Sequence, residues 1–400
     1  MLGLIYNFGL LVFFKYTNFF IENINALLTA THVQIPTISV VMPLGISFYT
    51  FQVVSYLVDV YRGEQRPVKN IINLGVYIAM FPQVTSGPIG LYSELEPTLL
   101  RRHCSVLNLE SGLKTFIIGM GAKMLLANPM GTLWAGMSRY GYETLSCPYA
   151  WLGAFGYSFQ LYFDFAGYSL MAMGLGQMLG LYVPRNFDHP YISGSMAEFW
   201  RRWHMTLGRW FKKYLYFPLG GSRCSFAKTI RNTFVVWAFT GLWHGASWTF
   251  VIWGLYHGVF LLLEEFIPIL GRLPKVINHI YALLAVTVGF VIFRADTIGQ
   301  GFDFIGNMFA GFNITDKSLS LALTQLTPWF IVMLVAAIIG CAPIKPIADK
   351  FRINGSATAL VGKKQNVAQT VLYVLAFAML IWCIIRLSGT SYNPFIYFRF

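Results

Sequence analysis

The chain has 400 residues, of which 56% are hydrophobic and only 11% are charged. An ordinary soluble domain carries roughly a quarter charged residues, so this composition excludes a soluble globular protein and favours an integral membrane protein. The formal net charge is +13. Because the lysines and arginines fall in short segments between apolar runs, we attribute this charge to membrane orientation and not to nucleic-acid binding.

Six apolar runs along the chain have lengths that suit membrane helices, which need about 20 mainly apolar residues, and three shorter runs are expected to add further helices. The sequence therefore predicts an all-α polytopic protein with about nine to eleven transmembrane, re-entrant and interfacial helices. No internal repeat or low-complexity linker divides the chain, so we expect a single membrane domain over residues 1–400. The apolar runs are residues 1–14, 36–58, 71–81, 113–126, 150–183, 233–263, 276–293, 319–341 and 367–385.

The first apolar run has neither a basic region before it nor a small-residue cleavage site after it. It is therefore interpreted as a membrane segment and not as a removed signal peptide. The five cysteines are far apart and form no C-x-x-C pair. Their spacing indicates neither a zinc site nor a disulfide framework, and we expect no metal site.

The run over residues 150–183 contains a single carboxylate, Asp164. Ionisable groups are costly inside a membrane, so Asp164 is a candidate for substrate binding, although a structural hydrogen-bonding role is equally open. Gly174, Gly176 and Gly180 faintly resemble a dinucleotide-binding loop, but they follow no predicted strand. We expect these glycines to allow close packing between helices.

Residues 185–231 form the main break in hydrophobicity and contain nine basic residues but only two acidic ones. The positive-inside rule places this segment on the cytoplasmic side of the membrane. Its basic residues suit attraction of the phosphates of coenzyme A or of an acidic carrier protein. Anchoring to anionic lipid headgroups is an equally open interpretation.

Within this segment the sequence predicts one amphipathic helix over residues 196–216, because Ser195 and Glu198 match a capping box and Pro218 follows the run. Tryptophans beside basic residues favour a place near the cytoplasmic interface. His204 would then point toward the interior, either as a functional group or as a histidine that only hydrogen-bonds a neighbouring helix or a lipid headgroup. A helical wheel puts Glu198, Arg202, Thr206, Arg209 and Lys213 on one face and Trp200, Trp203, His204, Leu207 and Phe211 on the other.

The apolar run over residues 233–263 is too long for one perpendicular span. We therefore expect a break near Gly245, which would place His244 at a helix end beside a cavity; a structural role for this buried histidine is the alternative. His257 is interpreted as a packing or interface residue. A histidine in a dry pocket suits acyl transfer, because an imidazole can take the proton of an attacking hydroxyl.

Four segments in this part of the chain carry a family resemblance. They read YFDFAGYSLMAMGLG, FWRRWHMTLGRWF, YFPLGGSR and GLWHGASW. In this order, the four segments resemble those of the membrane-bound O-acyltransferase (MBOAT) family. The resemblance is greatest to its bacterial branch, which contains alginate O-acetyltransferase and the teichoic acid D-alanylation protein. Similar segments at 13–20, 43–63, 81–89 and 393–400 extend the resemblance over essentially the whole chain. Family members usually carry further membrane helices before the first of these, so we expect this chain to lack counterparts of them.

The resemblance implies a ring of helices around a central channel, where a cytoplasmic acyl donor meets an acceptor from the other face. It implies that His244 is catalytic and that His204 is the second histidine at the channel. The residues expected to contact substrate are Arg201, Arg202, Trp203, Asn232, Trp243 and Asp164. No tightly bound cofactor is expected, and the donor is expected to be acetyl-coenzyme A or an acyl carrier protein.

We hypothesise that His244 is the general base on an acceptor hydroxyl and that His204 orients substrate or stabilises charge. The expected partners are a cell-surface or exported polysaccharide, or an extracytoplasmic acetyl-transfer protein, together with membrane lipids; the expected location is the bacterial plasma membrane. Three alternatives stay open. These are D-alanyl transfer from a carrier protein toward teichoic acid, transport or flipping of a polysaccharide precursor, and an inactive scaffold.

Overall fold

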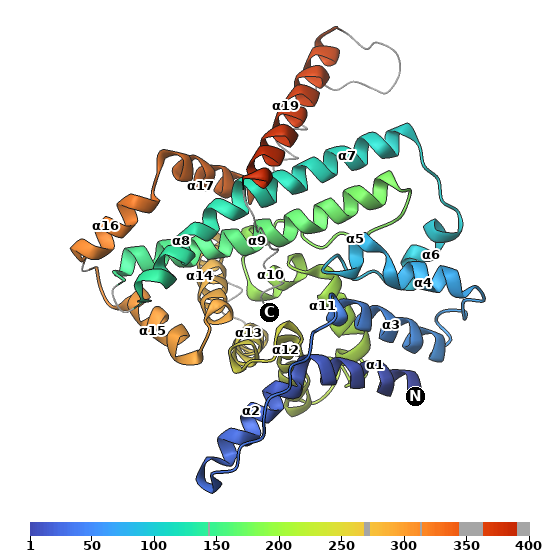
Figure 1. Cartoon of the computed structure of the whole chain (residues 1–400), viewed down its shortest axis with the longest axis horizontal. Coiled ribbons are helices and arrows are strands. Elements are labelled where there is room, and N and C mark those ends of the chain that lie inside the picture. Colours follow the sequence, from blue (N-terminus) through green and yellow to red (C-terminus); the bar gives the residue numbers. More distant parts are fainter. Residues whose placement is uncertain (143–144, 268–272, 313, 344–362, 390–400) are drawn as a thin grey trace.

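The computed structural model describes residues 1–142, 145–267, 273–312, 314–343 and 363–389. Every regular element within these ranges is helical and none is a strand, which confirms the predicted all-α class. Segment 393–400, which contributed to the family resemblance, lies outside the described residues. Figure 1 shows the arrangement of the helices.

The elements, with η marking 3₁₀ or π turns, follow in chain order. The first half comprises α1 (Leu2–Leu11), η1 (Val12–Tyr16), α2 (Thr17–Leu27), η2 (Thr29–Thr31), α3 (Ile46–Tyr61), α4 (Ile71–Ala79), α5 (Phe81–Val84), α6 (Tyr92–Leu100), α7 (Val106–Gly121), η3 (Ala122–Ala127), α8 (Asn128–Tyr140) and α9 (Cys147–Met178). The second half comprises η5 (Pro190–Ile192), α10 (Met196–Arg202), α11 (Met205–Phe211), η6 (Lys212–Tyr216), α12 (Phe226–His244), α13 (Trp248–Phe266), α14 (Lys275–Arg294), α15 (Ile298–Phe309), α16 (Asp316–Gln325), α17 (Pro328–Gly340) and α19 (Lys363–Ser388).

Five helical stretches among the described residues are long and apolar enough to cross a membrane. The pair α16 and α17, bent by 78°, adds a sixth if it counts as one broken span. The polytopic character is thereby supported, whereas the total of nine to eleven elements stays a prediction. The five stretches are Leu2–Leu27, Val106–Arg139, Trp248–Phe266, Lys275–Arg294 and Thr370–Ser388.

Helix α19 shows most clearly that the protein has an apolar exterior. It projects from the rest of the molecule (Figure 1). Only 6% of its most apolar stretch is buried inside the molecule. Leu372, Leu375 and Phe377 are among its exposed side chains. Contiguous apolar surface of this size is not stable in water, so lipid must cover it, and the protein is a membrane protein.

Helices α7 and α9 lie side by side (Figure 1), and they pack against each other through glycines. A Cβ placed on Gly119 would lie 2.5 Å from the Gly167 carbonyl oxygen, and one on Gly174 would lie 2.5 Å from the Gly112 carbonyl oxygen. The two contacts are therefore pairs of glycines, which let the two backbones approach closely. The expected packing role is confirmed for Gly174.

We predict that Gly119→Ala destabilises the protein by about 1–3 kcal/mol, because the new methyl group meets backbone atoms that cannot rotate away. A matched control is Gly75→Ala in α4, where a Cβ would meet nothing within 4 Å. Thermal unfolding in detergent, followed by the loss of the monodisperse peak in size-exclusion chromatography, measures the difference. Equal melting temperatures for both variants would contradict the close packing.

Helices α12 and α13 form the hairpin that carries His244. The predicted break is confirmed: α12 ends at His244, Gly245 is extended, and Ser247 begins α13 by accepting a hydrogen bond from the Thr249 amide. The arms pack tightly, since a Cβ on Gly254 would lie 2.2 Å from the Trp237 carbonyl oxygen. The hairpin therefore holds His244 at a rigid turn.

Two apolar runs contain less continuous helix than their length suggests. In the run over residues 36–58, helix α3 starts only at Ile46, and Gly45 has a left-handed φ of 76°. A Cβ on Gly45 would lie 2.0 Å from the Val84 carbonyl oxygen, so the segment before α3 passes too close to α5 for a side chain. In the run over residues 319–341, Pro328 begins α17 after the bend, since proline disrupts the interior of a helix.

Candidate active site

The single helix predicted over residues 196–216 is wrong, because the structure divides it at His204. Helix α10 ends at Arg202, and His204 has a left-handed φ of 44° before α11 begins at Met205. The main-chain carbonyl of Asn186 accepts from the Met205 amide at 2.9 Å. The Met205 amide therefore bonds to a residue outside the helix and not to a carbonyl of the preceding helical turn, so the helix does not continue. Local sequence rules do not detect such a distant partner.

The break changes which side chains face the interior. Trp203, Leu207 and Phe211 are buried as expected, but they pack against other helices of the chain, as does Trp210. Thr206, which the helical wheel placed on the basic face, is only 2% exposed. The prediction of one exposed basic face is therefore wrong at Thr206.

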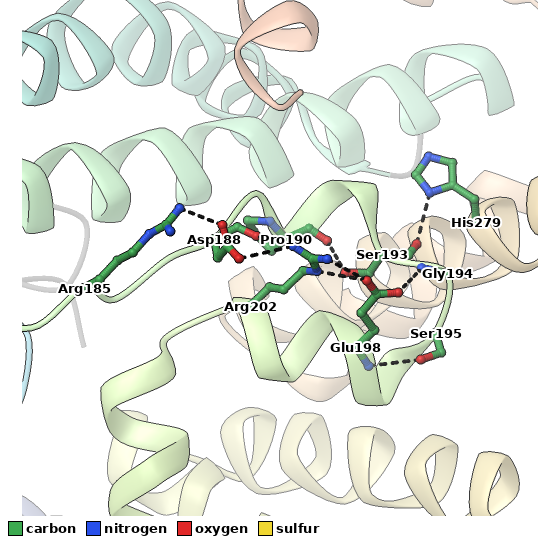
Figure 2. A network of polar contacts seen from close by, with 9 residues as sticks. All are labelled: Arg185, Asp188, Pro190, Ser193, Gly194, Ser195, Glu198, Arg202 and His279. Carbon is green, nitrogen blue, oxygen red and sulfur yellow. Dashed lines mark hydrogen bonds and ion pairs between the residues drawn. The ribbon is translucent and has the colours of Figure 1, made fainter. Parts of the chain in front are cut away.

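The start of α10 is fixed by a polar network (Figure 2). The Ser195 hydroxyl accepts from the Glu198 amide at 3.0 Å, as the capping box predicts, but Glu198 accepts from the amide of Gly194 and not of Ser195. Arg202 pairs with Glu198 at 2.9 Å and with Asp188 at 3.3 Å. Partial burial tends to raise the pKa of Glu198, but the hydrogen bonds from Gly194 and Arg202 outweigh it and lower that pKa. The carboxylate stays ionised and the network persists at neutral pH.

The ring of His204 is oriented by Asn186. The Oδ1 atom of Asn186 accepts from the Thr206 amide at 3.3 Å and from the Thr206 hydroxyl at 2.9 Å, and it lies 3.1 Å from His204 Nδ1. An oxygen that already accepts from Thr206 must also accept from the imidazole, so Nδ1 carries the proton. Nε2 is buried without a hydrogen-bond partner among the described residues, and as an acceptor it is available to a ligand.

His204 and His244 lie next to each other, as the family resemblance implies for two histidines at one channel. Their ring centroids are 6.5 Å apart. Trp243 contacts both rings, at 5.7 Å from His204 and 4.9 Å from His244. Both histidines are at least 95% buried. Two imidazoles are thus held together in apolar surroundings, by residues forty positions apart in the chain.

A cavity of about 720 Å³ reaches His204. Its lining runs from the exposed Arg201 and Lys212 to the buried Trp203 and His204, and it includes the opposing helices α12, α13 and α14. We call this space the basic cavity. Its volume suits a long flexible ligand with a charged end. Its exposed outer part carries Arg201, Lys212 and one acidic residue, Glu265, and its inner part is aromatic.

A second, smaller cavity of about 230 Å³ reaches His244. Its lining runs from the exposed Met42 and Leu44 to the buried Ser86, Trp243 and His244. We call it the hydroxyl cavity, because the hydroxyl-bearing residues Ser47, Thr85 and Ser86 are part of its lining. The two cavities share no lining residue, and each ends at one histidine of the pair.

The remaining predicted site residues divide into two groups. Arg201 and Trp203 line the basic cavity, and Trp243 lines the hydroxyl cavity. Arg202, Asn232 and Asp164 line neither. Asn232 donates to the Leu219 and Gly221 carbonyl oxygens, and Asp164 forms an ion pair of 2.5 Å with Lys123. Polar atoms of these three residues are engaged with other parts of the protein, and their contact with substrate stays a prediction.

His257 is a packing residue, in agreement with its interpretation from the sequence. It is fully buried, lines neither cavity, and is surrounded by aromatic rings with centroids 4.9 to 5.7 Å away. These rings belong to Trp200, Trp237, Trp253 and Tyr256.

Two residues at the site were missed by reasoning from the sequence. Asn186 gave no signal, because an asparagine between two prolines is typical of an ordinary loop. Lys15, which lines the hydroxyl cavity, did give one: it is the only lysine or arginine before Arg62, and it lies inside an apolar helix. An ionisable residue inside an apolar membrane helix is a functional candidate by default.

Comparison with known proteins gives consistent results. The profile of the MBOAT, or membrane-bound O-acyltransferase, family matches residues 66–294. The chain is 34% identical to the "Probable alginate O-acetylase AlgI" of Azotobacter vinelandii, over all of this chain and 84% of that protein. It is 36% identical to a peptidoglycan O-acetyltransferase of Helicobacter pylori over 74% of this chain and 62% of that protein. It is 31% identical to a teichoic acid D-alanyltransferase of Streptococcus thermophilus, over 56% of each chain.

Proposed function

This chain belongs to the membrane-bound O-acyltransferase family, and from that premise we propose that it transfers acetyl groups to a cell-surface or exported polysaccharide with His244 as general base. The observation that carries the proposal is the pair of adjacent histidines, each at the end of a separate cavity. Two substrates that approach through separate cavities could meet at the imidazoles without passing one another.

The chemistry requires an activated acyl group and a deprotonated hydroxyl. His244 takes the proton of the acceptor hydroxyl while the hydroxyl oxygen attacks the carbonyl carbon of an acyl thioester. The new carbon–oxygen bond forms, the carbon–sulfur bond breaks, and the imidazolium returns the proton to the departing thiolate. The Nε2 of His204 is a hydrogen-bond acceptor in this tautomer, so His204 is better suited to orienting the donor than to stabilising a negatively charged intermediate.

The basic cavity is the proposed entrance of the donor. Arg201 and Lys212 at its outer end suit the phosphates of acetyl-coenzyme A or an acidic carrier protein. The same cations suit anionic lipid headgroups, so a role in membrane anchoring is compatible with this proposal. No tightly bound cofactor is needed, because the acyl group arrives already activated as a thioester.

The hydroxyl cavity is the proposed entrance of the acceptor. The Ser86 hydroxyl is buried and has no hydrogen-bond partner among the described residues, so it is available to a sugar hydroxyl. The acceptor is a polysaccharide, or an extracytoplasmic protein that passes the acetyl group on. The proposal places the enzyme in the bacterial plasma membrane as a multi-pass protein.

Acetyl transfer is preferred over D-alanyl transfer because the O-acetylating relatives are more similar and cover more of the chain. We expect purified protein in proteoliposomes to move label from acetyl-coenzyme A to exported polysaccharide. Labelled D-alanyl carrier protein, supplied in parallel, should give no transfer. Mass spectrometry of surface glycans from cells with and without the gene should show loss of acetyl esters, and unchanged glycans with no transfer in vesicles would contradict the proposal.

A further inference from the structure

The C-terminus of α12, which carries His244, needs hydrogen-bond donors from elsewhere in the chain. An α-helix leaves its last four carbonyl groups without amides from a following turn. The Gly241 carbonyl still accepts from the Gly245 amide, at 3.4 Å. The next three carbonyls belong to Leu242, Trp243 and His244, and Gly245 then turns away in an extended conformation.

Two neighbouring side chains of the N-terminal helix supply these donors. The Tyr16 hydroxyl donates to the Leu242 carbonyl oxygen at 2.6 Å. The Lys15 ammonium donates to the Trp243 carbonyl oxygen at 2.6 Å and to that of His244 at 3.4 Å. The three carbonyls therefore have donors that lie more than 220 positions away in the sequence.

The third proton of the Lys15 ammonium extends this contact to α3. It is donated to the Ser47 hydroxyl at 3.0 Å, while the Trp243 indole donates to the Ser47 carbonyl oxygen at 3.4 Å. An ammonium has three donors, and three oxygens receive them here. Lys15 is therefore occupied by the protein itself, and a cation at a helix C-terminus also complements the helix dipole.

The backbone of the N-terminal helix is adapted to this contact. Lys15 and Tyr16 lie in the π segment η1, between α1 and α2 of a continuous helix. A π turn adds one residue to a helix and redirects the side chains beside it, and such turns are frequent at functional sites. Both side chains are thus directed to the turn from which His244 projects.

We propose that Lys15 and Tyr16 are positioning residues that cap α12 and hold His244 in its reactive place, an inference that rests on the proposed function. Lys15 donates a hydrogen bond to the main-chain carbonyl of His244 itself. Without the hydrogen bonds from Lys15 and Tyr16 the last turn of α12 frays, and the imidazole of His244 moves relative to the acceptor. The thioester would still bind, because the basic cavity shares no residue with this cap.

The test is steady-state transfer from acetyl-coenzyme A by reconstituted Lys15→Met, Lys15→Arg and Tyr16→Phe. Because misplacement by about 1 Å can cost about 10²-fold in rate, we expect Lys15→Met to lower kcat by about 10- to 100-fold with the donor KM unchanged. Tyr16→Phe should lower kcat less, and Lys15→Arg should restore most of it. Tyr16→Phe removes one hydroxyl only, so it keeps the test decisive if Lys15→Met folds poorly.

Lys123→Met is the matched control, since Lys123 is also a largely buried lysine in a π segment but pairs with Asp164 away from both cavities. It should lower thermal stability while the folded protein keeps its kcat. Wild-type kcat in both Lys15→Met and Tyr16→Phe would overturn the inference. His244→Gln, measured in the same series, separates the two claims: if it is inactive while the cap variants are fully active, only the cap is wrong, and if it is fully active, the proposed function fails.

Discussion

Replacing His244 by glutamine is expected to lower the rate of acetyl transfer by about 10² to 10⁴, the usual contribution of a general base. Glutamine keeps a polar side chain of similar length but cannot accept a proton at neutral pH. The donor KM should change little, since His244 does not line the basic cavity. The measurement is the initial rate of label transfer from acetyl-coenzyme A to the acceptor in proteoliposomes.

The control for this variant is His257→Gln. His257 is buried in the same hairpin as His244, but it lines neither cavity. It should retain a rate close to that of the wild type once the amount of folded protein is equalised. Equal rates for the His244 and His257 variants would show that His244 has no special part in the chemistry.

Replacing His204 by asparagine is expected to lower kcat/KM by about 10²-fold, as the loss of an orienting group can. Asparagine is chosen because residue 204 has a left-handed φ of 44°, which asparagine tolerates better than most residues. The donor KM should rise, in contrast to the His244 variant, because His204 lines the basic cavity. Titration with acetyl-coenzyme A at saturating acceptor distinguishes the two effects.

Asn186 offers a second way to test His204. Asn186→Ala keeps the imidazole side chain but removes the oxygen that orients the ring and fixes its tautomer, so a smaller loss is expected than for His204→Asn. If Asn186 acts through His204, the double variant should be little worse than His204→Asn alone, since residues that act as a unit are not additive. Fully multiplicative losses would mean that Asn186 acts independently of this ring.

Much of the fold follows from local rules of the membrane. Backbone polar groups in a bilayer must be satisfied within the same segment, so apolar length predicts helices well. The same reasoning located the break after His244, because a run of residues 233–263 exceeds the hydrocarbon thickness. It failed over residues 36–45, where the close approach of Gly45 to Val84 decides the conformation.

For the candidate site, too, reasoning from the sequence found some features and not others. The sequence identified His204 and His244 as the candidates for chemistry, and the structure brings their rings to 6.5 Å. It also suggested Arg202, Asn232 and Asp164, whose polar atoms are engaged with other parts of the protein. A motif indicates that residues belong to one functional region, but it does not separate those that face a ligand from those that support the backbone.

What the sequence determined by itself is the class of protein, its apolar helices, its family and the two histidines, because these depend on composition, local periodicity and motifs. Only the tertiary structure decided that residues 196–216 break at His204, that Asn186 fixes this ring, and that Lys15 and Tyr16 cap the helix of His244. Each of these features depends on a hydrogen bond to a residue between 18 and 229 positions away. Such partners meet only when the helices pack, and no local pattern records them.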